Sequence, residues 1–354
     1  MIPARPQPQV AHCRRLRGGV PSRRGQRGVA LLVAILLVAL GTIIAAAMAY
    51  NNAMTARRAV ATLSFDQALL ISEGAEALAA YGLQQTAKEN SPATYPGQPW
   101  SQPLPPTEVI PGVMLEAYLE DLQGRFNIND LVETDGETPN QPAIAAFQRL
   151  LSSLNLDTKW AYYLVDWIDK DTTPMTDGAE DSVYMEMDPP YRTPNLPITS
   201  TSELLALPGF TRADFDKLAP HIVALPLGVQ INVCSADPWV LDALTGHVQF
   251  SADPAQFQKD RTANGGCFPT PQEVEQAAGN VPATGSTLGT AAPVTSTAAA
   301  GPQQTLNNLL AEKSSWFRLT SFVTLGSAQF AIYTTLYQDP TGMARPVMRS
   351  FTPN

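Results

Sequence analysis

The segment that decides the fold runs from Gly28 to Tyr50 and reads GVALLVAILLVALGTIIAAAMAY. After the glycine it contains no charged residue, and as a helix rising about 1.5 Å per residue it is about 33 Å long. Because a bilayer core is about 30 Å thick, this segment can cross a membrane. The leader before it, residues 1–28, contains seven Arg and no acidic residue. The positive-inside rule then predicts a single-pass inner-membrane protein with a cytoplasmic N-terminus and a periplasmic body.

Three interpretations of the apolar segment are open. A secretory signal is cut after its apolar region, and Ala47-Met48-Ala49 offers the small residues of such a site. An uncleaved anchor is the second interpretation. The third rests on the junction, where the Arg-rich leader ends at Gly28 and the apolar run starts at once. This junction resembles a prepilin peptidase site, and the resemblance implies cleavage after Gly28 and N-methylation of the new terminal residue, Val29.

The body of the chain combines helical and strand patterns. No proline interrupts residues 22–91, so the Ala-rich stretch 51–88 is predicted to continue the apolar helix, whereas residues 90–112 contain seven Pro and are predicted to be a loop. Alternation of apolar and polar residues predicts strands at 113–119, 315–324, 328–337 and 346–351. Residues 140–225 have helical spacing, with helices predicted at 143–154, 160–168, 202–207 and 212–225.

The predicted strands lie on both sides of a helical block, so they can share one antiparallel sheet only if the block is an insertion. The sequence therefore predicts an α+β fold, in which a long N-terminal helix packs on an antiparallel sheet and a large all-helical domain is inserted. The apolar-Asn-apolar phrases at 126–128 and 231–233 resemble each other, which suggests an internal duplication. Residues 279–304 are uncharged and rich in Ala, Thr and Gly, which predicts a low-complexity loop.

The charge balance argues against a nucleic-acid partner. Of 23 basic residues the leader holds 7, which leaves 16 against 32 acidic residues in the remainder. Proteins that bind nucleic acid need a basic surface instead. The phrase Glu203–Phe210 looks like a helix–hairpin–helix turn, a motif that elsewhere binds the DNA backbone. A membrane-anchored periplasmic binding module of the DNA-uptake type is thus the alternative function, but the acidity favours a purely structural turn.

Several phrases together resemble the K-type minor pseudopilin of type II secretion (general secretion pathway protein K). They are the Gly28 junction, Val33 where most pseudopilins carry Glu, and the runs 122–131, 166–169, 190–192, 202–204 and 231–233. The resemblance implies a structural protein that is not an enzyme. Such a subunit forms a tip complex with the H-, I- and J-type minor pseudopilins, which initiates and caps a pseudopilus of major pseudopilin for export of folded proteins across the outer membrane.

The resemblance also implies processing by prepilin peptidase and a position at the tip, because a subunit without the Glu needs no partner above itself. It divides the chain into six parts. These are a cleaved leader (1–28), a transmembrane helix (29–50), the first part of a pilin-like domain (51–125), an inserted helical domain (126–278), a low-complexity loop (279–312) and the C-terminal strands of the pilin-like domain (313–354).

An acidic loop between Asp169 and Asp188 is the candidate metal site. Its carboxylates lie on a backbone that Pro and Gly make irregular, which suits Ca²⁺, and they repel one another unless a cation bridges them. The run does not match the EF-hand pattern, so its composition leaves a plain solvated loop open. K-type subunits bind calcium in this region, so the resemblance favours a structural Ca²⁺. The predicted ligands are Asp171, Asp177, Glu180 and Asp181, followed by Asp169 and Asp188.

Cysteine and histidine usage adds two expectations. Cys234 and Cys267 are predicted to form a disulfide in the oxidising periplasm, the alternative being two unrelated thiols. Beyond the leader only His221 and His247 are present, and neither lies in a recognisable catalytic motif. Asp166 and Asp169 are spaced like a glycosidase pair, but capping or ion binding explains them better. The sequence therefore predicts no enzyme.

Overall fold

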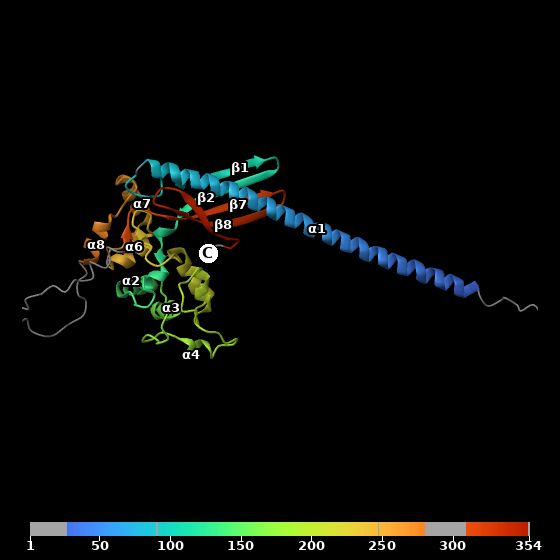
Figure 1. Ribbon diagram of the computed structural model, residues 1–354, viewed down its shortest axis with the longest axis horizontal. Helices are drawn as coiled ribbons and strands as arrows, with labels where there is room; N and C mark the ends of the chain where they lie inside the picture. Colours follow the sequence, from blue (N-terminus) through green and yellow to red (C-terminus); the bar gives the residue numbers. More distant parts are fainter. Residues whose placement is uncertain (1–26, 90, 247, 280–308, 353–354) are drawn as a thin grey trace, which may run out of the picture. The chain divides into compact units, whose positions relative to one another are not determined.

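The computed structural model describes residues 27–89, 91–246, 248–279 and 309–352 (Figure 1). All but the last two residues of the predicted leader (1–28), most of the predicted loop (279–312) and His247 lie outside the described residues. The chain forms two units, which divide between Leu63 and Ser64.

Helix α1 runs from Arg27 to Lys88, so the predicted long helix is confirmed. Its first part, as far as Leu63, is the described portion of the first unit. Every residue from Gly28 to Ala53 is exposed, and the helix contains a window of mean hydropathy 2.9 that is long and apolar enough to cross a membrane. An exposed surface of this kind needs lipid or another protein around it, because water solvates it poorly.

The second unit is built on a five-stranded antiparallel sheet in the order β1-β2-β7-β8-β9. The strands are β1 (Leu104–Ile110), β2 (Val113–Asp121), β7 (Trp316–Leu325), β8 (Ala328–Gln338) and β9 (Ala344–Ser350). Residues 64–88 of α1 lie on one face of this sheet (Figure 1). There Ala68 and Ala75 share a core with Leu115, Phe317 and Leu336. The predicted α+β, pilin-like fold class is confirmed.

The prediction that residues 90–112 form only a loop was wrong, because β1 occupies 104–110. Its two prolines, Pro105 and Pro106, lack an amide hydrogen, so they cannot supply the backbone donors that a strand with neighbours on both sides needs. An edge strand needs partners on one side only, and β1 is at the edge of the sheet. Proline content therefore excluded a central strand but not this one.

The insert (residues 122–315) interrupts the chain between two neighbouring strands. β2 and β7 pair directly, with Leu119 opposite Leu319, so both ends of the insert leave the sheet at nearly the same place. Its main helices are α2 (Gln141–Ser153), α3 (Trp160–Ile168), α4 (Asp181–Tyr184), α5 (Arg212–Leu218), α6 (Pro238–Thr245), α7 (Pro254–Ala263) and α8 (Pro271–Gly279). Short 3-10 helices lie before and between them, among them η3 (Ile128–Leu131) and η4 (Thr201–Ala206).

Two short parallel strand pairs accompany these helices, in addition to what the sequence predicted. β3 (Phe126–Asn127) pairs with β4 (Ile222–Val223), and β5 (Ile231–Asn232) pairs with β6 (Leu310–Ala311). Each pair contains one of the two similar apolar-Asn-apolar segments, at 126–128 and 231–233. The side chain of Asn127 accepts a hydrogen bond from the amide of Leu225 and donates to the carbonyl of Pro226, while Asn232 donates to the carbonyl of Thr94. Each buried amide therefore ties distant segments together.

The helix predicted over 212–225 was too long. α5 ends at Leu218, and the chain continues as a 3-10 turn and then as β4. Pro220 explains the end, because it has no amide hydrogen for the helical bond and its ring clashes with the preceding turn. The turn of the suspected helix–hairpin–helix motif connects a 3-10 helix, η4, to α5.

An ion pair between a buried carboxylate and a partly exposed arginine joins α1 to strand β9. Glu76 is 4 % exposed and accepts hydrogen bonds from Arg349, at 2.8 Å on each carboxylate oxygen, and from the hydroxyl of Thr334 at 2.7 Å. Arg349 also lies 3.4 Å from Glu73. This contact fixes the helix against β8 and β9 in one register.

Candidate functional site

The N-terminal junction lies in the first turn of α1. Gly28 and Val29 are both helical and exposed, and a Cβ atom added to Gly28 would have nothing within 4 Å. Val33, where the resemblance expects an acid in most subunits, is 48 % exposed. The apolar face here offers no charge to a neighbouring helix or to a terminal amine.

The acidic loop brings three carboxylates together. Oxygen atoms of Asp169, Asp171 and Glu180 all lie within 4.8 Å of one another. Asp169 is the residue after α3, where the backbone turns to an extended conformation, and Asp171 follows two residues later. Glu180 arrives from the other side, immediately before α4. The end of one helix and the start of another thus aim side chains at a common point.

Asp171 and the neighbouring Asp166 are held in place by hydrogen bonds. The carboxylate of Asp171 accepts from the amide of Thr173, at 2.6 Å, and its backbone carbonyl accepts from the side chain of Asn195, at 2.7 Å. Below them Asp166, fully buried in α3, accepts from the amide of Met175. Gly178 lies directly against Asp166, since an added Cβ would come within 2.0 Å of its carboxylate oxygen.

The electrostatics of this site are unfavourable without a cation. Burial and the nearby carboxylates of Asp171, Asp166 and Glu180 raise the pKa of Asp169 to about 7. Burial raises the pKa of Asp166 to about 6 and also raises the pKa of Glu180. All three pKa shifts have the same physical cause, because each charged carboxylate has lost water and lies near other negative charges. Among the described residues, no Lys or Arg lowers these pKa values.

Oxygen atoms without a partner point to what the site lacks. Asp169 Oδ1, Glu180 Oε1 and Asn195 Oδ1 are buried and make no hydrogen bond. A buried acceptor left unpaired costs free energy, and a hard cation that takes six to eight oxygen ligands would satisfy the two carboxylate oxygens, which belong to one cluster. The donor set of carboxylate, amide and carbonyl oxygen fits Ca²⁺ better than a soft metal. The residues present therefore fit such an ion.

The structure does not gather all the predicted ligands. Asp169, Asp171 and Glu180 converge, whereas the carboxylate of Asp181 pairs with Arg192 at 2.9 Å and accepts from the amide of Thr193. Asp177 and Asp188 are exposed outside the cluster. Sequence reasoning missed Asn195, which is 24 positions after Asp171 and carries no charge that would mark it.

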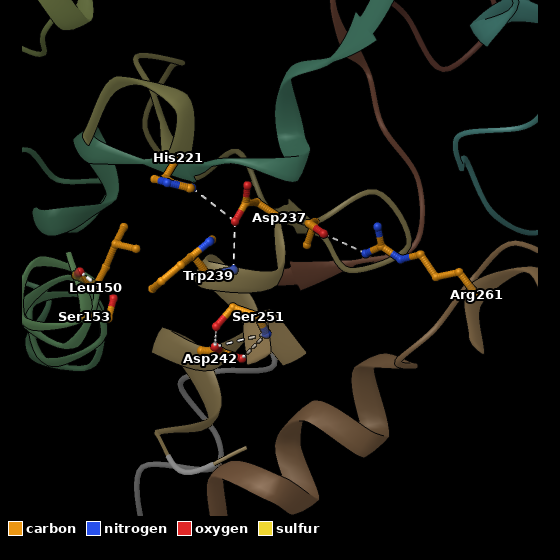
Figure 2. Close-up of polar contacts among 9 residues, drawn as sticks. Leu150, Ser153, His221, Asp237, Trp239, Asp242, Ser251 and Arg261 are labelled. Atoms are coloured by element: carbon orange, nitrogen blue, oxygen red, sulfur yellow. Dashed lines mark hydrogen bonds and ion pairs between the residues drawn. The ribbon is translucent and has the colours of Figure 1, made fainter. Parts of the chain in front are cut away.

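The structure joins Cys234 and Cys267 as a disulfide. Arg261, in α7, supports the same region by donating to the carbonyls of Val233, Ala236 and Phe268. Figure 2 shows this guanidinium reaching towards the loop that precedes α6. The bridge therefore fixes a part of the insert that contains no long regular element.

His221 is the remaining candidate for catalysis within the described residues. Its Nδ1 lies 3.1 Å from Asp237 Oδ1, and that oxygen also accepts from the amide of Trp239, at 2.7 Å, as the cap of α6 (Figure 2). The hydroxyls drawn beside it are already bonded, Ser153 to the carbonyl of Leu150 and Ser251 to Asp242. This arrangement orients a helix start rather than a nucleophile.

Comparisons with a family model, with curated proteins and with solved structures all find proteins of the type II secretion system that are similar to this chain. A family model described as type II secretion system (T2SS), protein K, matches residues 124–227. The type II secretion system protein K of Pseudomonas aeruginosa is 33% identical over 253 residues, which cover 69% of this chain and 74% of the relative. That of Klebsiella pneumoniae is 36% identical over 220 residues, 60% of this chain and 67% of the relative.

The fold is also similar to a solved structure. A chain of the GspK–GspI–GspJ complex from the enterotoxigenic Escherichia coli type 2 secretion system superposes with a TM-score of 0.64 at 22% identity, covering 84% of this chain and all of that one. The likeness therefore covers a larger share of the chain than residues 124–227, which the family model matches.

Proposed function

This chain belongs to the type II secretion system protein K family, and from that premise we propose that it is the minor pseudopilin that initiates and caps the type II secretion pseudopilus at its tip. In this role it assists the export of folded proteins across the outer membrane. The family is a structural one, and the work the chain does is assembly.

The observation that carries the proposal is α1. Residues 29–50 of the helix are exposed and contain no charged residue, whereas residues 64–88 pack on the sheet. A helix with this division suits a subunit that is stored in the inner membrane, with its body in the periplasm, and later packs against other helices in a fibre. Val33 supports a terminal position, because a subunit without an acid there has no charge to offer the amine of a subunit above it.

The exposed surface of α1 and the solved relative together support the proposed partners. The solved relative is in a complex with GspI and GspJ, and we extend this to the H-, I- and J-type minor pseudopilins, with the major pseudopilin below them. Leu70, Leu78 and Tyr81 are 66%, 57% and 59% exposed on the sheet-bound part of α1. At 100° per residue they lie within one third of the helix circumference, so they form a stripe that suits a neighbouring helix.

Processing at the junction is tested by N-terminal sequencing and intact mass of the protein extracted from membranes. The expected start is methylated Val29, produced by prepilin peptidase. Gly28→Leu should abolish cleavage, whereas Gly41→Leu should leave it unchanged, because both positions have free space around an added side chain and only the first adjoins the cut. A mature start at Tyr50 would show a secretory signal instead and contradict the proposal.

A bound Ca²⁺ is the second part of the proposal. Asp169, Asp171 and Glu180 would hold it, with Asn195 as a further oxygen ligand, and the ion would neutralise the buried carboxylates and order the loop. Calorimetric titration of the chelator-treated full chain in detergent tests this. Asp169→Asn should weaken binding by about tenfold or more, which corresponds to about 1.4 kcal/mol. Asp177→Asn, an exposed change outside the cluster, should not.

A further inference from the structure

Strand β9 forms an edge of the sheet with its outer side open. Among the described residues it pairs only with β8. The five consecutive residues Arg345–Arg349 are all exposed, and they include Val347 at 54% and Met348 at 38% exposure. Apolar side chains on an unpaired edge attract other strands, and proteins usually avoid them. Their presence here suggests that the edge is used.

The opposite edge of the sheet is better protected. β1 contains Pro105 and Pro106, which cannot donate hydrogen bonds, and its register against β2 shifts twice. β9 has one proline, Pro346, and one shift, after which residues 347–350 all carry amide hydrogens. β9 is therefore the edge that can accept a further strand.

An apolar groove adjoins this edge on one side. It has a volume of about 290 Å³ and lies between the sheet and the insert, with Val347, Met348 and Trp316 on the sheet side. Ile198, Val223 and Leu225 line it from the insert. The volume is close to the lower limit of about 300 Å³ for pockets that enclose a whole small molecule. It suits the side chains of a docked polypeptide better.

The groove lies on the face of the sheet that α1 does not cover. The register shift in β9 falls at Val347, and beyond it the side chains alternate, so that Arg349 points towards α1, where it pairs with Glu76. Its neighbour Met348 must then point to the other face of the sheet, which agrees with the position of Met348 in the lining of the groove. A strand laid beside β9 would put a side chain about 5 Å from that of Met348, directly at the groove. Edge and groove thus form one surface.

We propose that β9 and this groove bind an extended segment of an exported protein, which adds a strand to the sheet and places a large apolar side chain in the groove. Backbone pairing supplies affinity in such complexes, and a side-chain pocket supplies selectivity. Arg345, exposed beside Pro346, would favour an acidic residue next to the apolar one. Exported proteins are the occupant because of orientation, an argument that rests on the proposed function. If subunits pack through α1, the opposite face of the sheet is turned away from the fibre.

The test uses a photo-cross-linking amino acid, p-benzoylphenylalanine, placed at Val347 of the full chain in secreting cells. Adducts are identified by mass spectrometry and compared with the proteins in the culture medium. The same probe at Leu78, on the exposed stripe of α1, reports assembly with sister pseudopilins. We expect secreted proteins in the Val347 adducts. Ala224 also lines the groove, and filling the groove by Ala224→Met should lower their yield about tenfold, an effect of about 1.4 kcal/mol.

A second measurement checks the role in export. Val347→Lys places a charge on the edge and should reduce the amount of protein secreted, whereas Val109→Lys, a matched change at 41% exposure on β1, should not. Adducts at Val347 that contain only sister pseudopilins or a second copy of this chain, or none at all, would overturn the inference. Loss of sister adducts at Leu78 with secreted proteins still captured at Val347 would instead contradict the proposed assembly and leave the strand-binding edge intact.

Discussion

Removing Arg349 should destabilise the second unit, because it strands a charge. In Arg349→Met the carboxylate of Glu76, at 4 % exposure, keeps only the hydroxyl of Thr334 as a partner. Breaking a buried ion pair costs about 3–5 kcal/mol. The Arg349 side chain is 37% exposed, so water can reach part of the site. We therefore expect a loss of about 2–3 kcal/mol, after allowing for that solvent access.

The assay is thermal unfolding of the full chain in detergent, followed by circular dichroism. For a unit of this size about 1 kcal/mol corresponds to a change in Tm of about 2–4 °C, so Arg349→Met should lower Tm by about 5–10 °C. Arg212→Met is the matched control, because Arg212 and Asp216 form an ion pair whose side chains are 73% and 59% exposed. Its loss should change stability by less than about 0.5 kcal/mol.

The double variant Glu76→Met/Arg349→Met decides between explanations. Replacing both charges by apolar side chains removes the stranded carboxylate, so most of the lost stability should return. The coupling energy between the two substitutions should then be about 2 kcal/mol. If the double variant is as unstable as the sum of the single ones, the stranded charge is not the cause and the reasoning is refuted.

Three further predictions concern the insert. In the presence of a chelator, the raised pKa of Asp169, about 7, means that the folded state holds more protons than the unfolded state between about pH 4 and about pH 7. Tm should therefore fall as the pH rises from about 4 to about 7. Adding Ca²⁺ should restore Tm at about pH 7.5, and a Tm that responds neither to pH nor to Ca²⁺ would contradict the site. Cys234→Ala/Cys267→Ala opens a loop with a sequence separation of 33 and should cost about 3–4 kcal/mol in urea unfolding, an effect that reduction of the unaltered chain should match. Gly178→Ala, whose Cβ would come within 2.0 Å of a buried carboxylate oxygen, should lower both Tm and Ca²⁺ affinity. The control for the third prediction is Gly74→Ala in α1, where an added Cβ has free space and should raise Tm slightly.

The layers of the fold could be predicted because their signals are local. The apolar run from Val29 and the alternation in β7 and β8 follow from the periods of helix and strand. The position of the insert followed from a second step, since strands at both ends of the chain can share a sheet only across an insertion. β1 was missed because its prolines hide a strand pattern that only the edge position permits.

The candidate metal site was predictable in place but not in detail. The density of carboxylates identified the loop, yet the sequence prediction ranked Asp177 and Asp181 ahead of Asp169. The structure distinguishes them because Asp181 is paired with Arg192 and Asp177 lies exposed outside the cluster. Asn195 joins the site through its contact with Asp171. Such selection depends on which loops meet in space, and no local pattern encodes it.

The insert contains a disulfide and the proposed Ca²⁺ site. Its helices are short, with α4 only 4 residues long and α5 only 7, and much of the chain between them is irregular, so regular hydrogen bonding contributes little there. The Cys234–Cys267 bridge forms and persists in an oxidising compartment. The proposed Ca²⁺ would in turn relieve the repulsion among buried carboxylates. Because β2 and β7 are neighbours in the sheet, the sheet can form whether or not the insert is complete. We therefore expect the insert to reach full stability only after the body has crossed the inner membrane.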